Sequence, residues 1–240
     1  MDSCTVKLLK KEEVAERTMA FHFEKPAGFS FKPGQTIDVV LPGAGQGNAD
    51  DMRHTFSIVS APYEADLTIA TRMRDSAFKQ VLRAMSVGED AALEGPFGSL
   101  TLHNKRARPA ILLAGGIGIT PFVSMLRQAM HDALPQQLIL LYSNRRPEDA
   151  AFLPELQQLA QQNGQFRLVA TMTQMDASAQ PWDGETGVID ESLIRKVCVD
   201  LAEPVYYLAG PPGLVQAVRQ VLNRADVDDD DIRSEDFFGY

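Results

Sequence analysis

Roughly the first hundred residues alternate short apolar runs with turn-forming segments. The runs VKLLK, TMAFHFE, TIDVVL, FSIVS and LTIATR are rich in β-branched and aromatic residues, which favour strands. One amphipathic helix interrupts them, because Phe78, Val81, Leu82 and Met85 recur at helical spacing after a candidate N-cap, Ser76. EGPFG then closes this part of the chain as a turn. The pattern predicts an antiparallel β-barrel or sandwich.

The pattern changes after HNKRARP, a charged segment that we interpret as a linker between two domains. The apolar strands AILLA, QLILLYS, FRLVATMT and PVYYLAG alternate with helical segments at 120–131, 147–162, 190–199 and 212–224. Such alternation predicts βαβ units and a parallel sheet of about five strands with helices on both faces. We therefore expect an N-terminal antiparallel β-barrel domain over residues 1–103 and a C-terminal α/β domain over residues 104–240.

Composition narrows the functional classes. The formal net charge of −9 argues against a nucleic-acid partner. The two cysteines, Cys4 and Cys198, are too few to ligate an iron–sulfur cluster, and they suit a reducing compartment. The N-terminus lacks the apolar stretch of a signal peptide, so we expect a cytoplasmic protein.

One uncharged run, residues 109–126, is long enough to resemble a membrane span. Its centre, however, contains three glycines and a proline, and a strand-like half precedes a helix-like half. We therefore expect no membrane span.

The glycine-rich segment GGIGITP lies between the strand AILLA and a helix. In βαβ sheets, ligands bind beyond the carboxyl ends of the strands, where a helix N-terminus favours a pyrophosphate. Glycine lets the backbone approach a phosphate, Thr120 can cap the helix, and Pro121 suits its first turn. The candidate nucleotide-binding residues here are Gly115, Gly116, Gly118, Ile119, Thr120 and Pro121. A tight turn without any ligand remains the alternative.

A second turn of this kind, AGPPG, also follows an apolar strand and precedes a helix. Its candidate residues are Gly210, Pro211 and Pro212. Two such turns at one edge of a parallel sheet favour a nucleotide site over a chance connection.

Four motifs, RHTFSIVSAP, EGPFG, GGIGITP and AGPPG, occur in the order seen in the ferredoxin–NADP reductase family. The chain resembles that family over essentially its whole length. The resemblance implies a stand-alone two-domain form, in which an FAD-binding barrel precedes an NAD(P)-binding α/β domain. It also implies a C-terminal tail that returns to the flavin.

By this resemblance, Phe56 packs against the flavin ring and Ser57 forms a hydrogen bond near the isoalloxazine or the ribityl chain. The family's arginine position holds His54, with Arg53 one residue earlier. Side chains alternate along a strand, so these two should point to opposite faces, and which one meets the FAD pyrophosphate stays open. Arg72, Arg74 and Ser76 are candidates for a second pyrophosphate clamp. The FAD-binding candidates are Arg53, His54, Thr55, Phe56, Ser57, Ala70, Thr71, Arg72, Arg74, Ser76 and Tyr240.

The same resemblance implies where hydride transfer takes place. Ala209 stands where many family members carry a cysteine close to the nicotinamide. In many members a terminal aromatic residue stacks on the flavin face that the nicotinamide must reach, which gives Tyr240 the role of a gate. Phe237 and Phe238 favour docking of this tail, although a frayed terminus is the alternative. The candidate catalytic residues are therefore Ser57, Ala209 and Tyr240.

The segment YSNRRPED bears on the choice between NADPH and NADH. Residues after this strand usually meet the adenosine ribose, and here they are Asn144, Arg145 and Arg146. We expect Pro147 and the helix start to carry Glu148 and Asp149 away, so arginines remain for a 2′-phosphate. The segment favours NADPH, with NADH still open.

The expected function is an FAD-dependent oxidoreductase. It would pass electrons from NAD(P)H through the flavin to an external acceptor such as ferredoxin, flavodoxin, an oxygenase or a haem partner. No metal is expected. A flavin reductase that uses free flavin as substrate, and an electron-transfer subunit that depends on a partner, remain alternatives. The acceptor, the pathway and the oligomeric state stay open.

Overall fold

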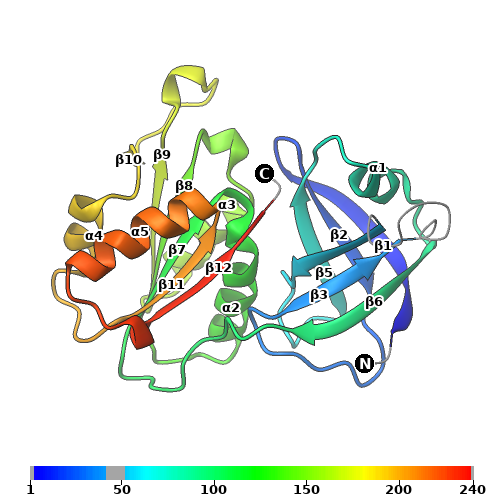
Figure 1. Ribbon diagram of the computed structural model, residues 1–240, viewed down its shortest axis with the longest axis horizontal. Helices are drawn as coiled ribbons and strands as arrows, with labels where there is room; N and C mark the ends of the chain where they lie inside the picture. Colours follow the sequence, from blue (N-terminus) through cyan, green and yellow to red (C-terminus); the bar gives the residue numbers. More distant parts are fainter. Residues whose placement is uncertain (1–2, 42–51, 239–240) are drawn as a thin grey trace.

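The computed structural model describes residues 3–41 and 52–238, which form a barrel domain and an α/β domain (Figure 1). The barrel sheet has the order β4-β3-β6-β1-β2-β5, and its neighbouring strands pair antiparallel. Its elements are β1 (Cys4–Ala15), β2 (Thr18–Glu24), β3 (Thr36–Val40), β4 (Arg53–Ser57), β5 (Asp66–Arg72), α1 (Ala77–Ala84) and β6 (Asp90–Phe97).

The barrel core follows from alternation along these strands. Inward positions such as Leu8, Phe21 and Ile37 are fully buried. Helix α1 adds Phe78 and Leu82 to the same core, and Ser76 caps it as predicted by accepting a hydrogen bond from the backbone N–H of Lys79. The sequence pattern missed strand β6, because its end, EGPF, has the composition of a turn.

The α/β domain contains a six-stranded parallel sheet with the order β10-β9-β8-β7-β11-β12. Its strands are β7 (Ala110–Gly115), β8 (Leu138–Asn144), β9 (Phe166–Met172), β10 (Glu185–Thr186), β11 (Val205–Gly210) and β12 (Ile232–Asp236). Its helices are α2 (Thr120–His131), α3 (Leu153–Gln162), α4 (Glu191–Cys198) and α5 (Pro212–Arg224). The fold class is confirmed, and the two-residue strand β10 together with β12 enlarges the sheet beyond the expected size.

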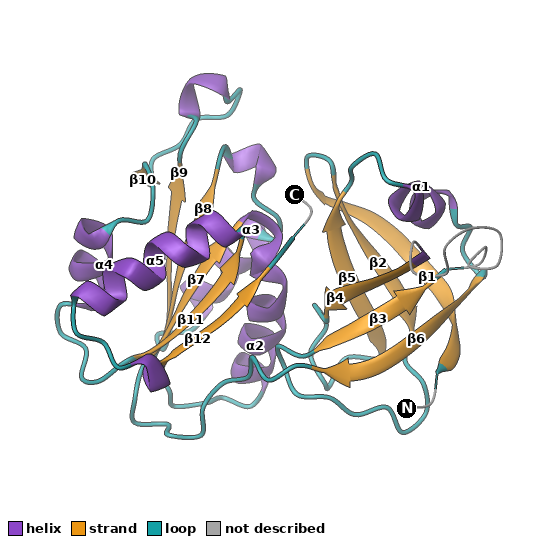
Figure 2. Cartoon of the chain, in the orientation of Figure 1, coloured by secondary structure: helices purple, strands orange, loops and turns teal. Residues whose placement is uncertain are grey.

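The helices cover both faces of this sheet, as Figure 2 shows. Helices α2 and α3 share one core with alternate residues of β7 and β8, and α4 and α5 share another core with the remaining positions. The helix predicted over residues 147–162 is divided. A short 3₁₀ turn occupies Pro147–Asp149, and Phe152 takes a left-handed φ of 61° before α3 begins.

Helix α2 attaches the two domains to each other. The Ser124 hydroxyl donates to the carbonyl of Ser60 in the barrel at 2.7 Å, and both residues are buried. Arg127 lies 2.7 Å from Glu155 in α3 and 3.3 Å from Glu64 of the barrel. These contacts hold the two domains together on either side of the candidate site.

The predicted linker segment packs closely. His103 is buried, with Nδ1 2.8 Å from the Tyr207 hydroxyl, and burial lowers its pKa. Arg108 forms an ion pair of 2.7 Å with Asp231. Over residues 3–41 and 52–238, no helix combines the length and the apolar character needed to cross a membrane.

Candidate flavin and nucleotide site

A cavity of about 650 Å³ lies between the barrel and the carboxyl edge of the parallel sheet. Strands β3, β4 and β5, the start of α1, the turn after β7 and the segment that ends β12 contribute to it. It brings together all the described FAD candidates, namely Arg53, His54, Thr55, Phe56, Ser57, Ala70, Thr71, Arg72, Arg74 and Ser76. Tyr240 lies outside the described residues.

Ser57 is the most informative residue in this cavity. Its side chain is buried, and its Oγ has no hydrogen-bond partner within the described part of the chain. A buried hydroxyl without a partner costs about 1–3 kcal/mol, so its position favours a ligand that completes the hydrogen bond. Phe56, the preceding residue, is half-buried and has its ring 5.7 Å from that of Phe78.

Arg53 and His54 occupy different environments on opposite sides of β4. Arg53 donates to Glu94 at 2.7 Å and to Asp38 at 2.9 Å, so two carboxylates balance its charge. His54 shares the side of Phe56, and its ring meets Phe78 edge-on at 4.4 Å. The predicted alternation therefore holds.

Cationic groups gather at the N-terminus of α1. Arg72 contacts Asp149 of the α/β domain at 3.2 Å, whereas Arg74 is exposed and forms no ion pair with any described residue. Lys79 lines the same cavity and donates to the carbonyl of Arg72 at 2.9 Å. Burial, and then the charge of Arg74, lower the pKa of Lys79. Sequence reasoning missed Lys79, because inside a helix it resembles any surface lysine.

The two glycine-rich turns touch each other. A Cβ on Gly118 would lie 2.3 Å from the carbonyl oxygen of Ala209, and a Cβ on Gly210 would lie 3.0 Å from the nitrogen of Gly115. Gly118 and Gly210 are therefore required for the close approach of the turns. Gly116 differs from these two, with a φ of +54° and open space where a Cβ would point. The approach of a phosphate to Gly116 stays a prediction.

The other residues of the turns separate into cavity-lining and buried positions. Ile117 and Thr120 line the cavity, whereas Ile119 is fully buried. Thr120 does not cap α2 as predicted, because its hydroxyl donates to the carbonyl of Ile117 at 3.0 Å. Pro121 takes its predicted place in the first turn of α2.

The second turn, AGPPG, joins the end of β11 to the start of α5. Ala209 is fully buried and is not among the residues that line the cavity. Gly210 ends β11, Pro211 caps α5, and Pro212 begins it. The proximity of Ala209 to the nicotinamide stays a prediction.

The end of β12 returns to the cavity. The backbone N–H of Phe237 donates to the carbonyl of Gly210 at 2.9 Å, and Phe237 and Phe238 line the cavity. Glu235 lines it as well, and burial raises its pKa. Sequence reasoning missed Glu235, because nothing in IRSED marks a half-buried carboxyl at the cavity.

A second cavity, of about 530 Å³, adjoins the first between the two domains. Arg145 and Arg146 line it, while Asn144 is buried at the end of β8. The expectation that Asp149 is carried away is wrong. The short 3₁₀ turn brings its carboxylate back to 2.9 Å from Nε of Arg146.

Several known proteins resemble this chain in sequence and fold. The family model for the oxidoreductase NAD-binding domain matches residues 112–220. The chain is 28% identical over 225 residues to the glycine betaine monooxygenase reductase subunit of Chromohalobacter salexigens. The aligned region covers 92% of this chain and 60% of that protein. It is 27% identical over 213 residues to ferredoxin–NADP reductase B of Sorangium cellulosum, over 85% and 84% of the two chains. This chain is similar to the ferredoxin–NADP reductase-like oxidoreductases.

A solved structure has the same fold. The ferredoxin NADP⁺ reductase from Neisseria gonorrhoeae with bound FAD and NADP matches with a TM-score of 0.80 at 22% identity, over 98% of this chain and 99% of that one. The cavity of this ferredoxin–NADP reductase-like chain suits FAD. It offers an aromatic ring, a buried hydroxyl whose partner is missing from the described protein, and cations at a helix N-terminus.

Proposed function

We propose that this chain is an NAD(P)H-dependent flavoprotein reductase that passes electrons through FAD to ferredoxin or to an oxygenase component. The observation that carries the proposal is the buried hydroxyl of Ser57, a residue that lines the cavity between the domains and whose Oγ has no partner among the described residues. The names of the relatives, a monooxygenase reductase subunit and a ferredoxin–NADP reductase, support the choice of acceptor class.

The protein's own part is to bind and orient the cofactor. When bound, FAD supplies the chemistry that accepts a hydride and releases electrons singly or in pairs. Phe56 packs against the ring system, and Ser57 donates a hydrogen bond to it. Arg74 and the N-terminus of α1, capped by Ser76, hold the pyrophosphate.

The nucleotide enters from the edge of the sheet. Gly116 and the helical segment that begins there would hold its pyrophosphate, because nothing lies within 4 Å of the place where a Cβ of Gly116 would point. Phe237 and Phe238 line the cavity. We expect this segment to move aside when the nicotinamide approaches the flavin. The stacking role of Tyr240 is part of this proposal.

The test uses the purified chain. It should be yellow or take up FAD, and NADPH or NADH should bleach its absorption under anaerobic conditions. Protein that stays colourless in excess FAD would overturn the proposal. Dialysis distinguishes the alternatives, because a flavin used as a diffusing substrate would be lost. A steady-state assay with an artificial acceptor tests whether the chain works without a partner.

A further inference from the structure

One side of helix α2 runs along the barrel at the domain boundary (Figure 1). Thr120, Ser124, Arg127 and His131 recur at intervals of four, three and four residues, so they lie on the same side of the helix. At about 1.5 Å per residue, this stripe spans roughly 16 Å. It begins at Thr120, which lines the cavity that suits FAD, and it ends at the last residue of the helix. The stripe therefore extends from the candidate site outward along the boundary.

Two residues of the stripe bind one short segment of the barrel, residues 60–64, which we call the barrel turn. The Ser124 hydroxyl donates to the carbonyl of Ser60 at 2.7 Å in a buried contact. Nη1 of Arg127 lies 3.3 Å from the carboxylate of Glu64, and both side chains are mostly buried. Hydrogen bonds and charged pairs depend on direction as well as distance, so these contacts specify how α2 lies against the barrel turn.

The third contact is a stacked pair of rings at the far end of α2. The rings of Tyr63 and His131 lie 4.0 Å apart between centroids, with 13° between their planes. Paired rings contribute stability beyond the area that they bury. Because three contacts of different kinds are spread along α2, the helix cannot tilt against the barrel turn without breaking at least one of them. We call these three contacts the α2 interface.

The barrel turn is itself held in place by the rest of the barrel. Nζ of Lys25 donates to the carbonyl of Pro62 at 2.6 Å and to that of Glu64 at 3.2 Å. The hydroxyl of Ser60 accepts a hydrogen bond of 2.9 Å from the backbone N–H of Thr68 in β5. The α2 interface therefore connects the α/β domain to a fixed part of the barrel.

The α2 interface also connects the two walls of the candidate site. The barrel turn comes shortly after β4, the strand that carries Phe56 and Ser57 into the cavity wall. Helix α2 directly follows the turn that contains Gly116, where we expect the nucleotide to bind. A shift of α2 against the barrel turn would therefore change the distance between the flavin side and the nucleotide side of the site.

We propose that Ser124, Arg127 and His131 are positioning residues for hydride transfer, because they set the distance between the nicotinamide and the flavin. The inference rests on the proposed function. In that reaction a hydride, one proton with two electrons, leaves the dihydronicotinamide ring, which is oxidised, and reduces the flavin. Such a transfer needs reacting atoms about 3–3.5 Å apart, and a displacement of about 1 Å can lower the rate about 10²-fold. The three residues are not among the described residues that line the cavity, so they act through the position of α2.

A second set of contacts keeps the domains together when the α2 interface is weakened. Arg146 of the α/β domain lies 2.8 Å from Glu16 of the barrel, and Arg72 of the barrel lies 3.2 Å from Asp149. Variants of the α2 interface should therefore stay folded and change the angle between the domains without separating them.

The test uses the FAD-loaded chain with two substitutions in the barrel turn, Tyr63→Ala and Glu64→Gln. They remove the ring stack and the charged pair across the boundary, while Arg127 keeps its contact of 2.7 Å with Glu155. Anaerobic stopped-flow reduction by NADPH or NADH should become about tenfold slower, whereas Kd for FAD and for the nucleotide should change less than about twofold. A primary deuterium isotope effect on the rate of the double variant would show that hydride transfer is the slowed step.

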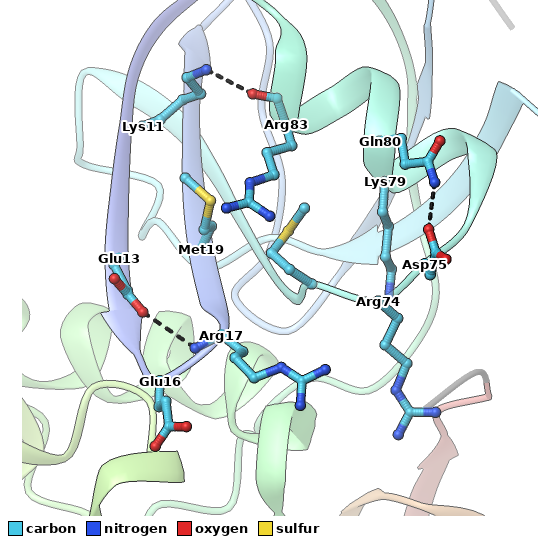
Figure 3. A pocket seen from close by; sticks show the side chains of 11 residues that line it. Lys11, Glu13, Glu16, Arg17, Met19, Arg74, Asp75, Lys79, Gln80 and Arg83 are labelled. Carbon is cyan, nitrogen blue, oxygen red and sulfur yellow. Dashed lines mark hydrogen bonds between the residues drawn. The ribbon is translucent and has the colours of Figure 1, made fainter.

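Two single variants provide the controls. Tyr63→Phe keeps the ring stack and should reduce the flavin at the rate of the wild type. Arg83→Gln removes an exposed arginine from the groove of the barrel shown in Figure 3, where Arg83 lies beside Lys11, and it should change neither rate nor affinity.

Hydrogen exchange followed by mass spectrometry gives a readout that does not depend on activity. In the double variant, amides of residues 60–64 and 116–124 should exchange about tenfold faster, while those of β2 stay unchanged. Equal reduction rates in the double variant and the wild type would overturn the inference, as would a slower rate explained by weaker binding of FAD or nucleotide. If neither nucleotide reduces the wild type, the proposed function itself fails. Unchanged exchange would show separately that the α2 interface does not hold the nucleotide turn.

Discussion

Gly118 and the carbonyl oxygen of Ala209 lie so close that a Cβ at position 118 would stand 2.3 Å from that oxygen. The contact joins the turn after β7 to the turn after β11, and both turns lie at the carboxyl edge of the sheet. The glycines of GGIGITP therefore have different structural roles. Gly118 holds the two turns together, while Gly116 faces open space.

Gly118→Ala should therefore destabilise the fold. The methyl group would meet backbone that cannot move without separating β7 from β11, at a cost of about 1–3 kcal/mol. Denaturant unfolding of the purified variant measures this cost. A denaturant midpoint equal to that of the wild type within error would contradict the assigned role of Gly118.

Gly116→Asn should affect nucleotide binding instead. Asparagine tolerates a positive φ, so the variant keeps the fold while its side chain occupies the space beside the N-terminus of α2. We expect KM for NAD(P)H to rise roughly tenfold, equivalent to about 1.4 kcal/mol, with FAD retained. If FAD is lost and nucleotide affinity is unchanged, the turn has been misassigned.

Ser57→Ala separates a ligand-binding role from a structural one. In the FAD-free protein the substitution removes a buried hydroxyl whose oxygen has no described partner, so stability should stay equal or increase. In the loaded protein it removes a hydrogen bond, and Kd for FAD should rise about fivefold. Fluorescence titration with FAD measures the second effect. A loss of stability with unchanged FAD affinity would show that Ser57 serves the fold.

Arg74→Gln and Arg53→Gln test which arginine meets the FAD pyrophosphate. Two carboxylates already hold Arg53, whereas Arg74 has no ion pair with the described residues. Arg74→Gln should therefore weaken FAD binding about tenfold, and Arg53→Gln should change it by less than about threefold. The reverse ranking would assign the pyrophosphate to Arg53.

The fold class could be predicted because local periodicity determines which residues are buried. Alternation in the barrel strands and 3.6-residue spacing in α2 and α5 both survive in the structure. Strand β6 was missed, since Gly95 and Pro96 interrupt its apolar pattern. The split before α3 was missed because the left-handed Phe152 has no signature in sequence.

Fewer features of the candidate site could be predicted from the sequence. The motif residues around Phe56 could be found, because their order along the chain is distinctive. The return of Asp149 to Arg146 could not, because it depends on Arg72 and Glu16, far away in the sequence.

Glu235 predicts a specific dependence of stability on pH. Burial raises the pKa of its carboxyl in the folded state, so the folded chain binds this proton more tightly than the unfolded chain does. Stability must therefore fall as pH rises from the unfolded pKa, near 4.3, through the folded pKa. Glu235→Gln removes this loss. The variant should match the wild type near pH 4 and have a higher Tm at pH 8.

The neighbouring Asp236 provides the control. It lies on the same strand but is exposed, so Asp236→Asn should leave the difference in Tm from the wild type nearly constant across this range. Thermal unfolding of the three proteins between pH 4 and pH 8 gives the comparison. If the Tm advantage of Glu235→Gln does not grow with pH, then the carboxyl ionises in the folded protein without a penalty. Burial would then not control its titration.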